Sequence, residues 1–91
     1  MERKEVEKVV KEAIFEKMGE FNGLDHAAQI MNEDKLDTDM AMDPFDLLEV
    51  LMGIEEKMDI RISDDVFGDK SVDELTVGIF VDMLYDWVKG K

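Results

Sequence analysis

Carboxylates are the side chains most able to do chemistry in this sequence, and they are concentrated between residues 36 and 65. That window holds ten acidic residues and two basic ones. Five of the acids follow one another at short spacings: Asp37, Asp39, Asp43, Asp46 and Glu49. Carboxylates spaced by two resemble the ligands of an EF-hand calcium loop, but with Asp37 as the first ligand the required glycine would be Met42 and the bidentate glutamate would be Leu48. The pattern therefore predicts no selective metal site, and at most weak divalent binding through charge density.

Few other residues offer catalytic chemistry. There is no cysteine, and His26 is the only histidine. The six glycines are scattered, so no glycine-rich phosphate loop is present. No motif positions an acid and a base about a substrate, and a lone loop histidine is more often structural than catalytic. We therefore expect a protein that is not an enzyme.

Helices are the elements that must position the acidic residues. Apolar residues at spacings of three and four predict a first helix over residues 2–18. Glycine and asparagine then interrupt the pattern, and we expect mainly loop up to Asp43, with a short helical turn over 26–31 that Asp25 could cap. This first connection is the long one in the chain.

Three further helix starts carry capping signals. Asp43 followed by Pro44 predicts a second helix that runs to about residue 58, because Asp accepts hydrogen bonds from free first-turn amides and Pro lacks the amide that would be unpaired. Ser63 predicts a cap for one short turn that ends at Gly68. Ser71 and a glutamate three residues later form a capping box, which predicts a last helix over 72–88. The sequence thus predicts one all-α domain over 1–91, a bundle of three long helices and one short helix.

The second helix has two apolar faces. At about 100° per residue, one face gathers core candidates. They are Leu47, Val50, Leu51, Ile54 and Met58. On the other side, Phe45, Leu48 and Met52 lie among carboxylates. Either Phe45 or Leu48 packs under the long loop above a solvated acidic face, or apolar anchors ringed by acids form a docking surface for a partner with a basic rim.

The segment 43–59, which begins Asp-Pro-Phe-Asp-Leu-Leu-Glu and contains a Glu-Glu pair, resembles the second helix of acyl carrier proteins. The family pattern there is Asp-Ser-Leu-Asp followed by alternating apolar and acidic positions. The charged first helix, the long loop, Ile-Arg-Ile before Ser-Asp-Asp, and a Ser-Val start to the last helix are also similar to the family order, so the resemblance covers nearly the whole chain. It implies an acyl-carrier-like four-helix bundle and a set of partner-binding positions. These are Asp43, Phe45, Asp46, Leu48, Glu49, Met52, Glu55 and Glu56.

Pro44 stands where the resemblance implies the serine that carries the 4'-phosphopantetheine arm. Proline has no nucleophilic oxygen, so it cannot accept the arm, and we expect no cofactor. Ser63 and Ser71 do not replace it, because both have the sequence context of helix caps, and Thr38 lies upstream in the loop. Pro44 is nevertheless compatible with the helix start, so loss of the serine does not predict loss of the fold.

The net charge of −13 disfavours nucleic acid and anionic membranes and favours a basic protein surface as partner. No apolar run approaches the length of a membrane span, and the first residues are charged rather than typical of a signal peptide, so we expect a cytoplasmic monomer. Our first hypothesis is a binding module that docks on carrier-dependent synthases or transferases without carrying the arm. The alternatives are a working acyl carrier with an unusual or altered attachment site and, more remotely, a calcium-binding helical protein.

Overall fold

A computed structural model describes residues 2–19 and 22–90; residues 1, 20, 21 and 91 of the expected 1–91 domain lie outside it. The regular elements of the described residues are all helices or helical turns, with no β-strand among them. The α-helices are α1 (Arg3–Met18), α2 (Pro44–Met58) and α3 (Val77–Lys89). Three short 3₁₀ turns accompany them: η1 (Ala27–Gln29), η2 (Asp64–Phe67) and η3 (Val72–Glu74). The prediction of a small helical bundle is confirmed.

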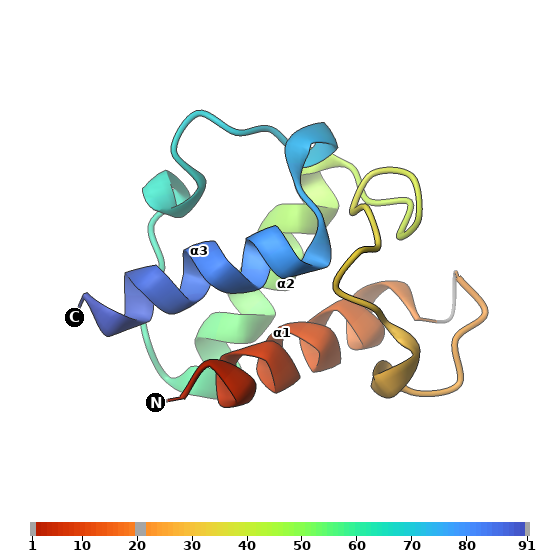
Figure 1. Cartoon of the computed structure of the whole chain (residues 1–91), viewed down its shortest axis with the longest axis horizontal. Helices are drawn as coiled ribbons and strands as arrows, with labels where there is room; N and C mark the ends of the chain where they lie inside the picture. Colours follow the sequence, from red (N-terminus) through yellow and green to blue (C-terminus); the bar gives the residue numbers. More distant parts are fainter. Residues whose placement is uncertain (1, 20–21, 91) are drawn as a thin grey trace.

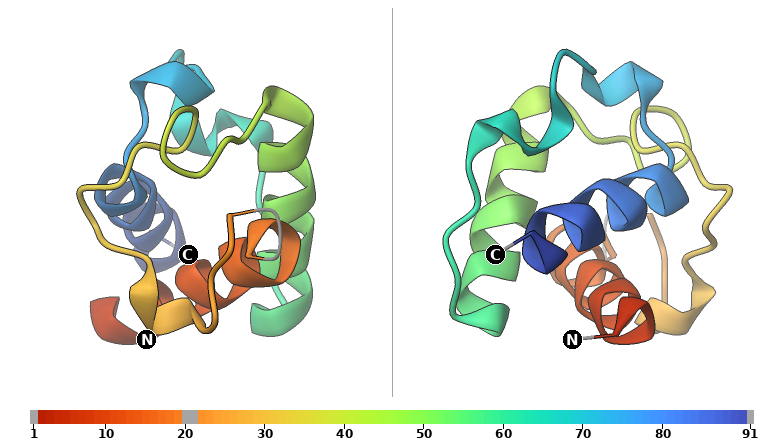
Figure 2. Two further views of the ribbon diagram at one scale, coloured as in Figure 1. Left: turned by 90° about the vertical axis from the view of Figure 1, so that its right-hand side faces the viewer. Right: turned by 60° about the vertical axis from the view of Figure 1, so that its left-hand side comes forward.

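The three α-helices pack with α2 crossing the other two. Figure 2 (left) looks nearly along α1 and α3, and α2 stands upright across them. Figure 1 shows α1 and α3 both lying across the view but running in opposite chain directions, with α2 behind them. Small residues meet at the crossing of α1 and α2, where a Cβ on Gly53 would lie 4.0 Å from that of Ala13. The radius of gyration is 11.8 Å, close to the roughly 12 Å expected of a compact folded chain of this length.

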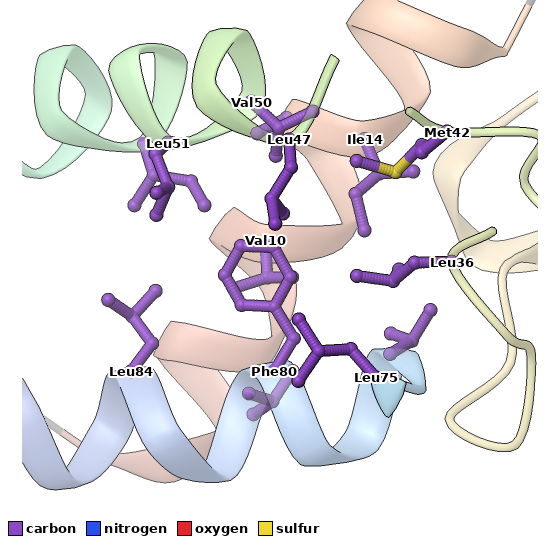
Figure 3. Packing of buried hydrophobic residues seen from close by; sticks show 14 of the residues in the cluster. Val10, Ile14, Leu36, Met42, Leu47, Val50, Leu51, Leu75, Phe80 and Leu84 are labelled. Carbon is purple, nitrogen blue, oxygen red and sulfur yellow. The ribbon is translucent and has the colours of Figure 1, made fainter. Parts of the chain in front are cut away.

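The core lies between the helices and is closed at one end by the long first connection. Figure 3 shows Phe80 of α3 pointing toward α2, with Leu51 facing Leu84 and with Leu36 and Met42 from the connection beside them. Phe80 also meets the ring of Phe67 edge to face, at 5.1 Å between centroids, which ties η2 to α3. No polar or charged residue of the described chain is buried, so hydrophobic burial carries the fold.

The connection between α1 and α2 is mainly non-helical, as predicted, but its short turn differs from the prediction. The turn covers Ala27–Gln29 rather than 26–31, and its first residue follows His26. The Asp25 side chain accepts no hydrogen bond from this turn. Instead the Gln29 side chain accepts hydrogen bonds from the backbone amides of Asp25 and His26, at 2.6 and 3.1 Å. Gln29, the last residue of the turn, therefore caps the backbone at its start.

The predicted start of the last helix is wrong by five residues. The capping box at Ser71 exists, but it begins only the three-residue turn η3. Leu75 is then extended and buried, and its carbonyl accepts a hydrogen bond from the Leu36 amide at 3.1 Å. The Val77 amide in turn donates to the Asp34 carbonyl at 2.9 Å, so the chain here makes an antiparallel bridge with the first connection and α3 starts only after it.

Candidate functional site

The head of α2 is built as its sequence predicts. The Asp43 carboxylate accepts a hydrogen bond from the Asp46 amide at 2.8 Å, and the Asp46 carboxylate accepts one from the Asp43 amide at 3.2 Å. Pro44 follows Asp43 as the first helical residue and is exposed. Both acids therefore hold the helix start in place, and Pro44 completes it without an unpaired amide.

One side of α2 is buried and the other exposes apolar side chains. Leu47, Val50, Leu51 and Ile54 are buried as predicted, whereas Met58 is only partly buried against them. On the opposite side Phe45 is 75% exposed, Met52 62% and Leu48 46%. The alternative in which Phe45 packs under the loop is excluded by that exposure.

The carboxylates of α2 differ in how they are held. Glu49 accepts a hydrogen bond from Lys17 of α1 at 2.6 Å, and Asp46 lies 4.0 Å from the same ammonium group. The hydrogen bond to Glu49 raises the pKa of Lys17. Glu56 is exposed and makes no hydrogen bond or ion pair with any other residue of the described ranges. Glu56 is therefore the carboxylate of this face that is fully available to a partner.

Glu55 has a different environment from its neighbour Glu56. It is half-buried, and its carboxylate accepts a hydrogen bond from the Ile62 amide at 2.7 Å. It thus fixes the chain that leaves α2 rather than pointing freely outward. We name the outward residues of α2, Phe45, Leu48, Glu49, Met52 and Glu56, the α2 face.

Two open hollows lie at the far end of the α2 face, and the sequence did not predict them. The first, of about 390 Å³, is lined by Met52, Glu55, Glu56, Asp59, Ile60 and Arg61. The second, of about 270 Å³, is lined by Ile60, Arg61, Trp87 and Val88 and is mostly apolar. The Ile-Arg-Ile segment was the available signal, but nothing local in the sequence brings it beside the end of α3.

The acids that resembled a calcium loop do not gather into a site. Asp37 accepts a hydrogen bond from the Thr38 amide at 2.8 Å, and Asp39 accepts one from the Lys35 amide at 2.7 Å. Within residues 2–19 and 22–90, no three His, Asp or Glu side chains converge to hold a metal ion. These two aspartates instead stabilise turns of the first connection.

His26 is exposed just before η1, remote from the α2 face along the chain, and belongs to no group of residues in the described ranges that could hold a metal ion. Across those same ranges, the helices are too short or too polar to cross a membrane. No known family model matches the chain, and no solved structure is significantly similar to it.

Proposed function

We propose that this chain is a binding module that uses the α2 face to dock on a basic surface of enzymes of acyl metabolism, of fatty acid or polyketide type. It acts as an acyl-carrier-like partner that carries no phosphopantetheine. Its partners are carrier-dependent synthases or transferases, for which it serves as a structural subunit, decoy or regulator. It has no catalytic role of its own.

The α2 face is the observation that supports this proposal. Three large apolar side chains, Phe45, Leu48 and Met52, are exposed on a helix whose other face already fills the core. At about 100° per residue, Glu49 and Glu56 fall in the same sector as Phe45 and Met52. Apolar anchors beside carboxylates suit a partner with a basic rim, because charge steers the encounter and desolvated apolar contacts hold the complex.

The resemblance to acyl carrier proteins suggests the class of partner. Pro44, which has no nucleophilic oxygen, is the reason to propose that the chain carries no phosphopantetheine arm. Pro44 occupies an exposed first helical position, with its helix start held by Asp43 and Asp46. A substitution there changes the available nucleophile without removing a core contact or a cap. This allows the docking role and the carrier role to be tested separately.

The docking role is tested by binding to a panel of purified carrier-dependent synthases and transferases. We expect Phe45→Ala and Glu56→Lys each to weaken binding at least about tenfold, since hot-spot residues contribute about 2 kcal/mol or more. Neither side chain makes a hydrogen bond or ion pair within the described ranges, so the fold should be retained. Glu33→Lys, at an exposed loop residue, is the matched control for the change in charge. Equal weakening by Glu56→Lys and Glu33→Lys would show a general charge effect and contradict the proposal.

The carrier role is tested with coenzyme A and a broad phosphopantetheinyl transferase, followed by intact-mass measurement. We expect no mass gain on the native chain and a gain on Pro44→Ser. A gain on the native chain would instead establish the alternative, a working carrier with an unusual attachment residue. No gain on either chain would contradict the likeness to a carrier at the head of α2.

A further inference from the structure

Hydrogen bonds hold the chain that leaves α2 against the end of α3. Asp59 adopts a left-handed conformation with φ of 54°, which turns the chain out of the helix. The Ile60 amide donates to the Glu55 carbonyl at 3.2 Å, and the Glu55 carboxylate holds the Ile62 amide. Between these two bonds, the Arg61 carbonyl accepts a hydrogen bond from the Trp87 indole at 3.3 Å. Residues 60–62 therefore form a wall between α2 and the end of α3 that three hydrogen bonds hold in place.

That wall separates the two hollows, because Ile60 and Arg61 line both. The first hollow opens toward the α2 face, with which it shares Met52 and Glu56. The second opens toward the end of α3, where Trp87 and Val88 lie. Figure 2 (right) shows the last turns of α3 beside the lower half of α2, with the connecting chain passing them. The α2 face thus continues into two successive hollows.

The chemistry of the hollows selects a cationic, partly apolar occupant. Met52, Ile60, Trp87 and Val88 supply apolar surface. Exposed Glu56 and Asp59 line the first hollow, and Arg61 is the only base among the lining residues. An anionic ligand would be repelled by this excess of acid, whereas a Lys or Arg side chain can lay its aliphatic stem on Met52 or Ile60 and its charge near the carboxylates.

We propose that the two hollows bind a cationic amphipathic helix of a partner protein, as a continuation of the α2 face. One apolar residue of that helix occupies the hollow at Trp87, and its basic residues face Glu56 and Asp59. A helix fits better than an extended strand because the described residues contain no sheet edge to pair with, and helix-in-groove binding uses a row of apolar anchors. This inference rests on the proposed docking function and adds to it a second anchor point and the kind of segment that is bound.

Trp87 is the only tryptophan of the chain, so its fluorescence reports on the second hollow. The probe is a tryptophan-free, 16-residue peptide of Lys and Leu whose leucines recur at helical spacings of three and four. The control peptide has the same composition with its leucines spread around the helix. At physiological salt we expect the patterned peptide to shift the Trp87 emission to shorter wavelength and to bind at least about tenfold more tightly than the control.

The matched variants are Val88→Lys, inside the second hollow, and Ile79→Lys, an exposed position near the start of the same helix. Both add one positive charge to α3. We expect Val88→Lys to weaken binding of the patterned peptide at least about tenfold and Ile79→Lys to leave it unchanged. Far-UV circular dichroism and thermal unfolding test whether each variant is folded. If Val88→Lys is not folded, Met52→Lys provides a second test, in the first hollow.

Several results would overturn the inference. Equal binding of both Lys and Leu peptides would show that only general charge attraction is involved. A shift of Trp87 emission by the corresponding Glu and Leu peptide would show that the occupant need not be cationic. Self-association that Val88→Lys abolishes would identify a second copy of this chain as the occupant. Binding to the enzyme panel separates the two proposals. If Glu56→Lys weakens that binding and Val88→Lys does not, docking through the α2 face stands and the second anchor is wrong. If neither variant weakens that binding, both proposals are wrong.

Discussion

Ala41 has a φ angle of 56°, in the left-handed region that a β-carbon disfavours, three residues before α2 begins. Its side chain is exposed, so the methyl group contributes little packing. Glycine adopts this conformation without the steric cost, which is about 1–2 kcal/mol for other residues. We expect Ala41→Gly to raise the free energy of unfolding by about 1 kcal/mol, measured by urea denaturation followed by circular dichroism.

Ala28 provides the control for this prediction. It is also exposed, it lies in η1, and its φ is not positive. Ala28→Gly adds only the backbone entropy of glycine and should lower stability by up to about 1 kcal/mol. Similar losses for the two variants would contradict strain at Ala41.

Glu7 is the described carboxylate whose pKa is clearly altered. Lys11 donates a hydrogen bond to it at 3.0 Å and Arg3 a second at 3.3 Å. The pKa of Glu7 falls below its ordinary 4.5, chiefly because of the hydrogen bond from Lys11. A carboxylate with a lowered folded-state pKa stabilises the fold above its unfolded pKa and loses this contribution as pH falls through the folded value.

We therefore expect the native chain to lose more stability below about pH 4.5 than Glu7→Gln does. Urea denaturation of both chains at several pH values on either side of 4.5 measures this difference. Glu33→Gln, at an exposed position, controls for the loss of one negative charge. If native chain and Glu7→Gln showed parallel pH curves, Glu7 would play no part in acid sensitivity.

At the scale of elements, the two candidate caps of the last helix give a direct test of where it starts. The Thr76 hydroxyl accepts a hydrogen bond from the Ile79 amide at 3.1 Å and caps the 13-residue helix α3. Ser71 precedes only the turn η3. We expect Thr76→Ala to lower the free energy of unfolding by about 1 kcal/mol and Ser71→Ala to lower it by less. A larger loss for Ser71→Ala in urea denaturation would favour a continuous helix from residue 72.

The same comparison explains what the sequence could and could not predict about the elements. For α1 and α2, apolar periodicity and terminal residues agree, so their bounds are predicted to within one residue. At Leu75 the local pattern favours helix, but the carbonyl bonds to Leu36, some forty residues earlier. Local sequence patterns do not indicate a hydrogen-bond partner that lies so far away in the chain. The second hollow escaped prediction for the same reason, since it needs residues 60–61 beside Trp87.

The sequence likewise predicts some features of the candidate site and not others. The position of Phe45, Leu48 and Met52 on the outer side of α2 follows from helix periodicity once Leu47 and Ile54 are assigned to the core. The different environments of Glu55 and Glu56 do not, because they depend on the path of the chain after α2. Sequence therefore predicted which side of α2 points away from the core. The structure determined that Phe45 on that side is exposed rather than packed under the loop, and how far the α2 face extends.

At the scale of the whole molecule, the ion pairs between α1 and α2 neutralise only one carboxylate of the α2 face, Glu49, and leave Glu56 exposed. Lys57 binds Glu16 of α1 at 2.6 Å, and Lys17 binds Glu49. These pairs are at the surface, where ion pairs contribute little to stability. The net charge of −13 therefore causes a general repulsion among the acidic residues, which opposes folding. The same excess of negative charge attracts a basic partner.

Salt should consequently act in opposite directions on folding and on docking. Raising NaCl from about 50 to 500 mM shortens the Debye length from roughly 14 to 4 Å, which screens repulsion among the 24 acids and attraction to a basic partner alike. We expect the thermal unfolding midpoint to rise and the affinity for the Lys and Leu peptide, or for a partner enzyme, to fall. CaCl₂ at matched ionic strength separates screening from ion binding: equal midpoints would indicate screening alone, whereas a markedly higher midpoint in calcium would show that the acids bind the ion. A midpoint that falls with NaCl would mean that the surface ion pairs outweigh the general repulsion.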